Sequence, residues 1–245
     1  VGNVTFIENA WNQFLDWLKG DQNEISGKIG YIVIAGDLVD GIGVYPNQER
    51  ELRIKDIYEQ YELLGKYLSE IPSNVHIVVS PGNHDAVRGA EPQPALPEEV
   101  RTFFPKNTIF VGNPSLIEIE GVKILIYHGQ SFDNYINAIS GLEYSKPEHV
   151  MVEMLKRRHL FPIYGGNSWI APESEDHGVI DPIPDILHCG HTHTVGISKY
   201  RGILLVNAGT WQEQTEYQKK KNITPVPGCA AVVDLSKMNA KVLRF

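Results

Sequence analysis

The 245-residue chain has little cysteine, no long apolar run and a shortage of positive charge. Its two cysteines, Cys189 and Cys229, are too few for a disulfide framework or a four-thiolate zinc module. We expect both to be reduced, buried thiols. No run of 18 or more apolar residues occurs, and the N-terminal VGNVTF lacks the basic flank and apolar core of a signal peptide. These absences predict a soluble, cytoplasmic protein without a membrane partner.

Acidic residues outnumber basic ones, with 30 Asp and Glu against 22 Lys and Arg, which gives a formal net charge of −8. Such a surface argues against tight nucleic-acid binding through phosphate contacts alone. If the substrate is a polyanion, bound cations or a partner must help to hold it. The 42% hydrophobic content can bury a sizeable core. Because no repeat, low-complexity tract or linker-like shift in composition occurs, we predict one domain over residues 1–245.

Apolar periodicity predicts helices alternating with strands, followed by a strand-rich C-terminal part. Helical spacing covers residues 6–18, 48–71 and 147–158. Strands are expected over 30–35, 75–79, 109–111, 116–119, 122–127, 186–188, 195–200, 202–206, 230–235 and 241–245. The stretch 161–184 carries Pro, Gly and Ser and is expected to cross the surface as a loop. This order predicts an α/β fold of two packed sheets with helices outside.

Four expected strands end in a small-residue turn followed by a side chain that can bind a metal. The turns are Gly36-Asp37, Gly82-Asn83-His84-Asp85, His128-Gly129 and Gly190-His191-Thr192-His193. Loops at the carboxyl ends of strands are where open α/β sheets bind ligands, so these four could converge on one site. Taken singly, each has a structural explanation, because Asp and Asn favour turns and caps and a lone histidine often sits in a core. Only His191 and His193, two residues apart in an extended segment, point to a metal by themselves.

The order and spacing of these motifs, GD, GNHD, a single H and GHTH, resemble the calcineurin-like metallophosphoesterase signature. The resemblance covers nearly the whole chain and implies a four-layer sandwich, with two mixed β-sheets flanked by α-helices. It also implies two divalent metal ions, which clamp a phosphodiester and lower the pKa of a water. Asp37 would bridge them, Asn83, His128 and His191 would complete one metal, and His193 would bind the other. These ligands suit Mn, Fe, Zn or Ni, and the family favours manganese.

Two further residues of the second loop are expected to act in catalysis. His84 follows a metal ligand and can face the scissile phosphate, where it would stabilise the transition state or protonate the leaving 3′ oxygen. Asp85 is expected to orient His84, or else to cap the following turn. His188 is offset by three from His191 and is expected to be structural.

One motif of the family is absent, because no Asp-x-His occurs anywhere in the sequence. In relatives this motif ends the first strand and serves the same metal as His193. Val1-Gly2-Asn3 resembles the residues that follow it, so we expect the chain to begin just after the motif. One of the two metal sites would then be incomplete.

Longer stretches narrow the resemblance within the superfamily. The clamping arginines of serine/threonine phosphatases are missing, since Gly41 and Pro81 stand in their places. The stretches GDLVDGIGVYPNQ, SPGNHDAVRGAEPQPALPEE and GTWQEQT resemble the small subunits of archaeal family D DNA polymerases, and the match runs from about residue 30 to residue 235. This implies a metal-dependent 3′→5′ exodeoxyribonuclease that acts on single-stranded or mismatched 3′ ends of DNA. Its partners would be a large catalytic subunit and a sliding clamp.

Two other functions stay open at this point. One is a non-catalytic scaffold, because small subunits of eukaryotic replicative polymerases resemble the same fold but have degenerate metal motifs. The other is a repair nuclease that shares the core motifs but lacks the GTWQEQT and KRRHL surroundings. Outside the metal loops, Lys156-Arg157-Arg158-His159 either contacts a DNA strand or ends a helix. Trp211 either stacks on a frayed base or fills the core.

Overall fold

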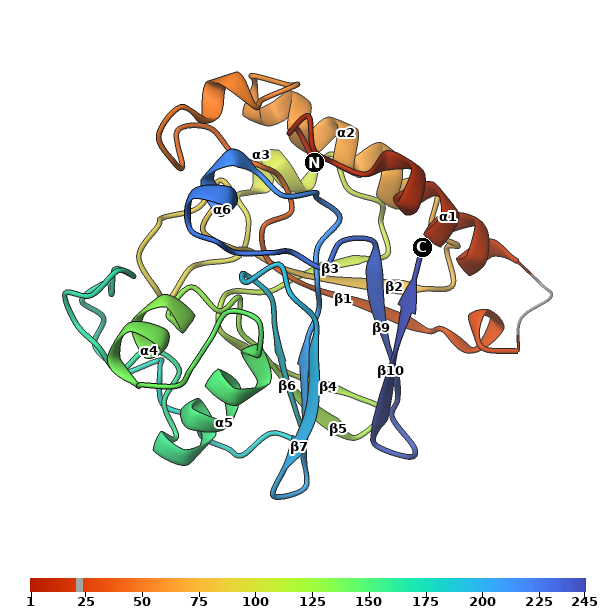
Figure 1. Cartoon of the computed structure of the whole chain (residues 1–245). Coiled ribbons are helices and arrows are strands. Elements are labelled where there is room, and N and C mark those ends of the chain that lie inside the picture. Colours follow the sequence, from red (N-terminus) through yellow and green to blue (C-terminus); the bar gives the residue numbers. More distant parts are fainter. Residues whose placement is uncertain (21–23) are drawn as a thin grey trace.

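The computed structural model describes residues 1–20 and 24–245, and it shows two sheets packed between two layers of helices (Figure 1). One helical layer contains α1 (Glu8–Lys19) and α2 (Ile57–Ser69). The other contains α4 (Phe132–Ala138) and α5 (Pro147–Arg157). The expected α/β sandwich of two sheets flanked by helices is therefore confirmed.

The smaller sheet is parallel throughout and joins β1 (Tyr31–Ala35), β2 (His76–Ser80) and β3 (Thr108–Phe110). The larger sheet is mixed and has the strand order β4-β5-β6-β8-β7. Its strands are β4 (Ser115–Ile119), β5 (Val122–Ile126), β6 (Ile186–Cys189), β7 (Gly196–Tyr200) and β8 (Ile203–Asn207). A hairpin of β9 (Cys229–Asp234) and β10 (Asn239–Arg244) completes the strands.

The two sheets bury apolar side chains on both of their faces. Successive side chains of a strand point to opposite faces, so each central strand contributes to two cores. On β2, Val78 packs between the sheets, while Ile77 and Val79 pack against α1 and α2. On the larger sheet, Ile126 lies between the sheets and Leu125 faces α4 and α5. This arrangement makes the strands rigid supports for the loops at their ends.

Most predicted elements are confirmed to within about two residues, but the helix predicted over 48–71 was wrong at its start. The helix α2 begins at Ile57, because the Asp56 side chain accepts hydrogen bonds from the backbone N–H groups of Tyr58 (2.8 Å) and Glu59 (3.1 Å). Only a single 3₁₀ turn, Gln48–Arg50, precedes it.

The periodicity also missed short elements, namely α3 (Glu98–Arg101), α4, α6 (Glu216–Lys220) and a 3₁₀ turn at Ser26–Lys28. Segments of this length are too short to show a helical period.

Other expectations can be checked directly. Cys189 and Cys229 are free and buried, as predicted. Residues 161–184 contain no helix or strand, also as predicted. Across residues 1–20 and 24–245, no helix is long and apolar enough to cross a membrane.

A groove with a volume of about 1300 Å³ runs between β1 and the β9–β10 hairpin. Within the described parts of the chain, β1 pairs only with β2, and the hairpin pairs with neither sheet. The groove is lined by apolar residues along these strands, and it reaches Asp37, His84, His191 and His193 at one end. The predicted site therefore opens onto this groove.

Candidate metal centre

Two glycines let the first two loops approach closely enough to share a site. Gly36 follows β1 with a positive φ of 84°, and a Cβ atom there would lie 2.5 Å from Nδ1 of His128 and 2.7 Å from Cα of Gly82. A Cβ on Gly82 would in turn collide with the Asp37 side chain. The glycines of the GD and GNHD motifs are thus required by close packing between the loops.

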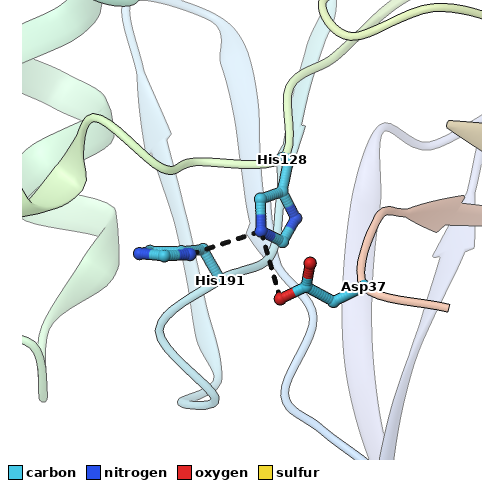
Figure 2. A group of neighbouring side chains, drawn as sticks. All are labelled: Asp37, His128 and His191. Carbon is cyan, nitrogen blue, oxygen red and sulfur yellow. Dashed lines mark hydrogen bonds and ion pairs between the residues drawn. The ribbon is translucent and has the colours of Figure 1, made fainter. Parts of the chain in front are cut away.

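Four potential ligand atoms converge at the ends of the strands. The Nε2 atom of His128 lies 3.0 Å from Oδ1 of Asn83, 3.3 Å from Oδ2 of Asp37 and 3.3 Å from Nδ1 of His191. Figure 2 shows the Asp37, His128 and His191 side chains turned toward one another from three different segments. Ligand atoms of these three residues all lie within 4.8 Å of one another. Carboxylate, amide and imidazole groups in this arrangement fit a divalent cation of the transition series.

The orientation of each ligand ring is set by a second contact. His128 donates a hydrogen bond from Nδ1 to the carbonyl oxygen of Ala35 (2.8 Å), so its Nε2 atom faces the other loops. Nε2 of His191 lies 3.6 Å from Oδ1 of Asp133, which leaves Nδ1 facing the centre. Tyr144 holds Asp133 through a 2.8 Å hydrogen bond from its hydroxyl group. Carboxylate and carbonyl partners of this kind fix the tautomer of a metal-binding histidine.

Asp133 was not among the residues predicted from the sequence. It lies in the first turn of α4, five residues after His128. The only signal available was an acidic residue soon after a ligand loop, and such residues are common in helix starts.

Asp37 and His128 strongly affect each other's charge. Burial raises the pKa of Asp37, but the His128 and His84 rings outweigh it and hold that pKa well below its ordinary value. Burial lowers the pKa of His128, but the Asp37 carboxylate outweighs it and raises the pKa to about 9. Since a metal ligand must be deprotonated, cation binding here requires His128 to release a proton.

His84 lies beside the ligands and faces Asp37. Its Nδ1 donates to the carbonyl oxygen of Asp40 (2.7 Å), and its Nε2 lies 3.9 Å from Oδ2 of Asp37. The His84 ring therefore takes its orientation from the Asp40 carbonyl group, and not from Asp85 as expected.

The Asp85 carboxylate holds the loops together. It is buried and accepts hydrogen bonds from the Tyr61 hydroxyl (2.9 Å), the Gly82 N–H (2.8 Å) and the Leu38 N–H (3.3 Å). Burial, with the Asp37 charge adding to it, raises the pKa of Asp85 to about 6. The Asp85 side chain therefore links the GD and GNHD loops, and none of its hydrogen bonds found in the described residues caps the following turn, which was the alternative expectation.

His193 lies apart from this cluster of ligands. Its Nδ1 accepts a 2.7 Å hydrogen bond from Nε2 of Gln218. The Gln218 amide cannot turn around freely, because its oxygen accepts the Thr215 N–H in the capping box of α6 (3.1 Å). A neutral His193 ring that accepts at Nδ1 carries its proton on Nε2, the nitrogen a metal would otherwise use. Burial lowers the pKa of His193 to about 4, so the ring is neutral at pH 7.

Two residues singled out from the sequence have structural roles. The Trp211 ring packs in the core, with its centroid 5.2 Å from that of Trp11 and 5.4 Å from that of Phe14. His188 is buried, and its ring nitrogens lie 3.2 Å and 3.3 Å from the carbonyl oxygens of Val206 and Val33.

The basic run after α5 is also engaged within the chain. Lys156 and Arg157 pair with Glu153. Arg158 donates to the Ile180 carbonyl oxygen and pairs with Asp181.

The chain belongs to the DNA polymerase alpha/epsilon B-subunit family, whose sequence profile matches residues 4–195. The particular relatives that it resembles are DNA polymerase II small subunits from archaea. The Archaeoglobus fulgidus protein is 57% identical over 94% of this chain and 48% of its own length. The Methanothermobacter thermautotrophicus protein is 46% identical over all of this chain and 52% of its own length. The resemblance to archaeal polymerase small subunits is thus confirmed, and the chain spans about half the length of these relatives.

Solved structures with similar folds include an archaeal phosphodiesterase and the sorting protein Vps29. The phosphodiesterase superposes with a TM-score of 0.47 and 15% identity, over 97% of this chain and 92% of its own. Vps29 from Entamoeba histolytica, complexed with zinc, gives a TM-score of 0.41 and 16% identity, over 96% and 88% of the two chains.

Proposed function

We propose that this chain is a metal-dependent 3′→5′ exodeoxyribonuclease, the proofreading part of an archaeal replicative DNA polymerase. The observation that carries the proposal is the convergence of Asp37, Asn83 and His191 on Nε2 of His128, at 3.0 to 3.3 Å. The polymerase setting rests on the similarity to archaeal small subunits. Phosphodiester hydrolysis is a reaction that such a ligand set serves in other metalloenzymes.

Asp37, Asn83, His128 and His191 would hold one cation, and Asp37 and His193 would face a second. When bound, divalent cations, with manganese preferred over Fe, Zn or Ni, supply charge neutralisation and an acidified water. The oxygen and imidazole groups that converge here fit ions of this class.

The side chains around the cation have separate tasks. His84 is fixed by the Asp40 carbonyl oxygen with its Nε2 atom on the Asp37 side. From there, a protonated Nε2 would donate to the leaving 3′ oxygen or to a phosphate oxygen. Asp85 acts at a distance by holding the two ligand loops together.

The partners that we propose follow from the charge of the chain. A net charge of −8 opposes DNA binding over the surface as a whole. A large catalytic subunit would therefore deliver the single-stranded or mismatched 3′ end, with a sliding clamp as a further contact. We assign the complex to the cytoplasm, at the nucleoid.

The test is digestion of DNA with a mismatched 3′ end by the purified chain after chelation and reloading with Mn²⁺. Shortening from the 3′ end should require Mn²⁺ and should be lost in His128→Ala. Calorimetry on both proteins shows whether metal is bound. If the wild type binds Mn²⁺ and still leaves the DNA intact, the nuclease proposal fails.

The second candidate is a non-catalytic scaffold for the polymerase. One observation favours it, namely the hydrogen bond from Nε2 of Gln218 to Nδ1 of His193, which leaves the ring proton on Nε2. A scaffold would bind the large subunit equally well as wild type and as His128→Ala. Co-purification of both proteins with that subunit, beside the digestion assay, separates the two functions.

A further inference from the structure

The helix α6 carries side chains on two sides of the candidate metal centre. Gln218 points inward and contacts His193. The preceding residue, Tyr217, is 43% exposed, and its ring centroid lies 5.7 Å from that of Tyr45. The Tyr45 ring in turn lies 6.3 Å from the ring of His84. Three rings therefore lead from the solvent to the residue expected beside the scissile bond.

The middle ring of this row is held firmly in place. The Tyr45 hydroxyl donates to Oε2 of Glu51 (2.9 Å) and accepts from Nδ2 of Asn3 (3.3 Å). The other carboxylate oxygen of Glu51 accepts the backbone N–H of Glu216, the first residue of α6 (3.0 Å). One acidic side chain thus fixes both Tyr45 and the start of the helix that carries Tyr217.

A positive charge lies beside the outer ring. The ammonium group of Lys221 is 6.0 Å from the centroid of Tyr217. A lysine therefore lies next to the exposed ring.

These groups lie outside the apolar cores, and most of the lysines beside them have no acidic partner. Neither Tyr45 nor Tyr217 belongs to the three apolar cores found in the described residues. Lys219-Lys220-Lys221 is the only run of three lysines in the sequence. Of these, only Lys219 has an acidic partner among the ion pairs in residues 1–20 and 24–245. In the basic run at 156–158, by contrast, each residue pairs with an acid, Glu153 or Asp181.

An exposed aromatic ring, with lysines that have no acidic partner beside it, matches the chemistry of single-stranded nucleic acid. Bases stack on aromatic side chains whatever their sequence, and lysines contact the phosphates. On a protein with a net charge of −8, lysines without an acidic partner next to the candidate metal centre would favour a polyanion there.

We propose that Tyr45, Tyr217 and Lys221 form a nucleotide subsite for the single-stranded end of DNA. The Tyr217 ring stacks on a base adjacent to the scissile phosphate, Tyr45 supports that ring, and Lys221 contacts the neighbouring phosphate. The inference rests on the proposed function, because it takes DNA as the substrate, and it names where the strand enters.

The test measures binding without hydrolysis, so that it does not depend on catalysis. The probe is a short single-stranded oligonucleotide with a fluorescent base analogue next to its 3′ end, titrated with the full chain in the presence of a chelator. Stacking should quench the analogue. Tyr217→Ala should weaken binding by about 5- to 100-fold and abolish quenching, and Tyr217→Trp should restore both. Tyr58→Ala, at an exposed tyrosine of α2, is the matched control.

A second variant tests the phosphate contact. Lys221→Gln should weaken binding and lower the slope of log Kd against log salt by about 0.7. Lys106→Gln, at an exposed lysine far along the sequence, is its control. An oligonucleotide with an abasic position in place of the analogue should bind wild type as weakly as the intact probe binds Tyr217→Ala.

Several outcomes would overturn the subsite. It fails if Tyr217→Ala binds and quenches like wild type, or if the abasic probe binds as tightly as the intact one. It also fails if α6 proves to be a contact for the large subunit, seen as loss of co-purification in Tyr217→Ala with unchanged DNA binding. A chain that binds through Tyr217 but never cuts DNA would refute the nuclease and keep the subsite. A chain that cuts DNA equally well with and without Tyr217 would support the nuclease and refute the subsite.

Discussion

Glu91 is a fully buried acid, and we predict that it makes the stability of the fold depend on pH. Within residues 1–20 and 24–245, neither of its carboxylate oxygens has a hydrogen-bond partner. Burial raises the pKa of Glu91 from 4.5 to about 7. The Tyr127 hydroxyl and the His128 ring lie close enough to oppose the shift, but the hydroxyl is not in hydrogen-bond geometry. A charged carboxylate at this place is therefore poorly compensated.

The size of the effect follows from the two pKa values. Between the ordinary value of 4.5 and about 7, the folded chain keeps a proton on Glu91 that the unfolded chain has lost. The free energy of unfolding then falls by about 1.4 kcal/mol per pH unit as the pH rises. The stabilising contribution of the protonated Glu91 is fully present below the unfolded-state pKa of 4.5. It is lost as the pH rises through the folded-state pKa of about 7, and the total loss is about 3 kcal/mol.

Glu91→Gln removes the charge at every pH and keeps nearly the same shape. Urea unfolding of wild type and variant, with a chelator present, should therefore be compared at about pH 5, 6, 7 and 8. The free energy of unfolding of the variant should rise relative to that of wild type as the pH rises. The difference between the two should change by up to about 3 kcal/mol over that range. Taking the difference cancels the titration of groups that do not interact with Glu91. Glu99→Gln, at an exposed acid, is the control.

Parallel curves for wild type and Glu91→Gln across this range would refute the reasoning. They would mean that the Glu91 carboxylate is solvated or paired in the folded chain. A constant offset between the curves would reflect only the packing of the amide group.

Three further predictions concern the site. Gly36→Ala places a Cβ against the His128 ring at a positive φ, so calorimetry should show Mn²⁺ affinity reduced by about 10- to 100-fold. Tyr61→Phe removes a hydrogen bond to the buried Asp85 carboxylate, and urea unfolding should show a loss of about 1–3 kcal/mol; an unchanged midpoint would contradict that role. Gln218→Leu removes the hydrogen bond to Nδ1 of His193, so ¹⁵N NMR should show a mixture of the two neutral tautomers in place of the Nε2-protonated one alone. An unchanged spectrum would mean that Gln218 does not set the tautomer.

The sequence predicted the parts of the site that strand geometry determines. His128 and His191 follow the neighbouring parallel strands β5 and β6, whose carboxyl ends lie at the same edge of the larger sheet. Asp37 follows β1 of the smaller sheet, which packs against the larger one. Close packing of Gly36 against the His128 loop then leaves little freedom in where these side chains lie. The order of the motifs was therefore enough to predict that these side chains lie close together.

The rest of the site depends on contacts between segments with no periodic signal. The helix α6 has five residues, so nothing in its pattern shows that Gln218 reaches His193. Asp133 lies in another short helix, and its distance from His191 depends on how that helix packs. The position next to His84 in the sequence suggested that Asp85 orients it. In the structure the Asp85 side chain instead accepts hydrogen bonds from the backbone N–H groups of Leu38 and Gly82.

The candidate ligands Asp37, His128 and His191 already lie close together, whereas a cation held by His193 would have to be bound against existing contacts. To bind metal through Nε2, His193 must move its proton to Nδ1, where it would meet the donor Nε2 of Gln218. The Gln218 amide must then turn, and its oxygen leaves the Thr215 N–H unpaired in the capping box of α6. Losing a hydrogen bond of this kind costs about 1 kcal/mol. Occupancy of the second site is thereby coupled to the start of the helix that carries Tyr217 and precedes Lys221. A second cation bound at His193 would alter the position of the same side chains that we propose receive the DNA strand.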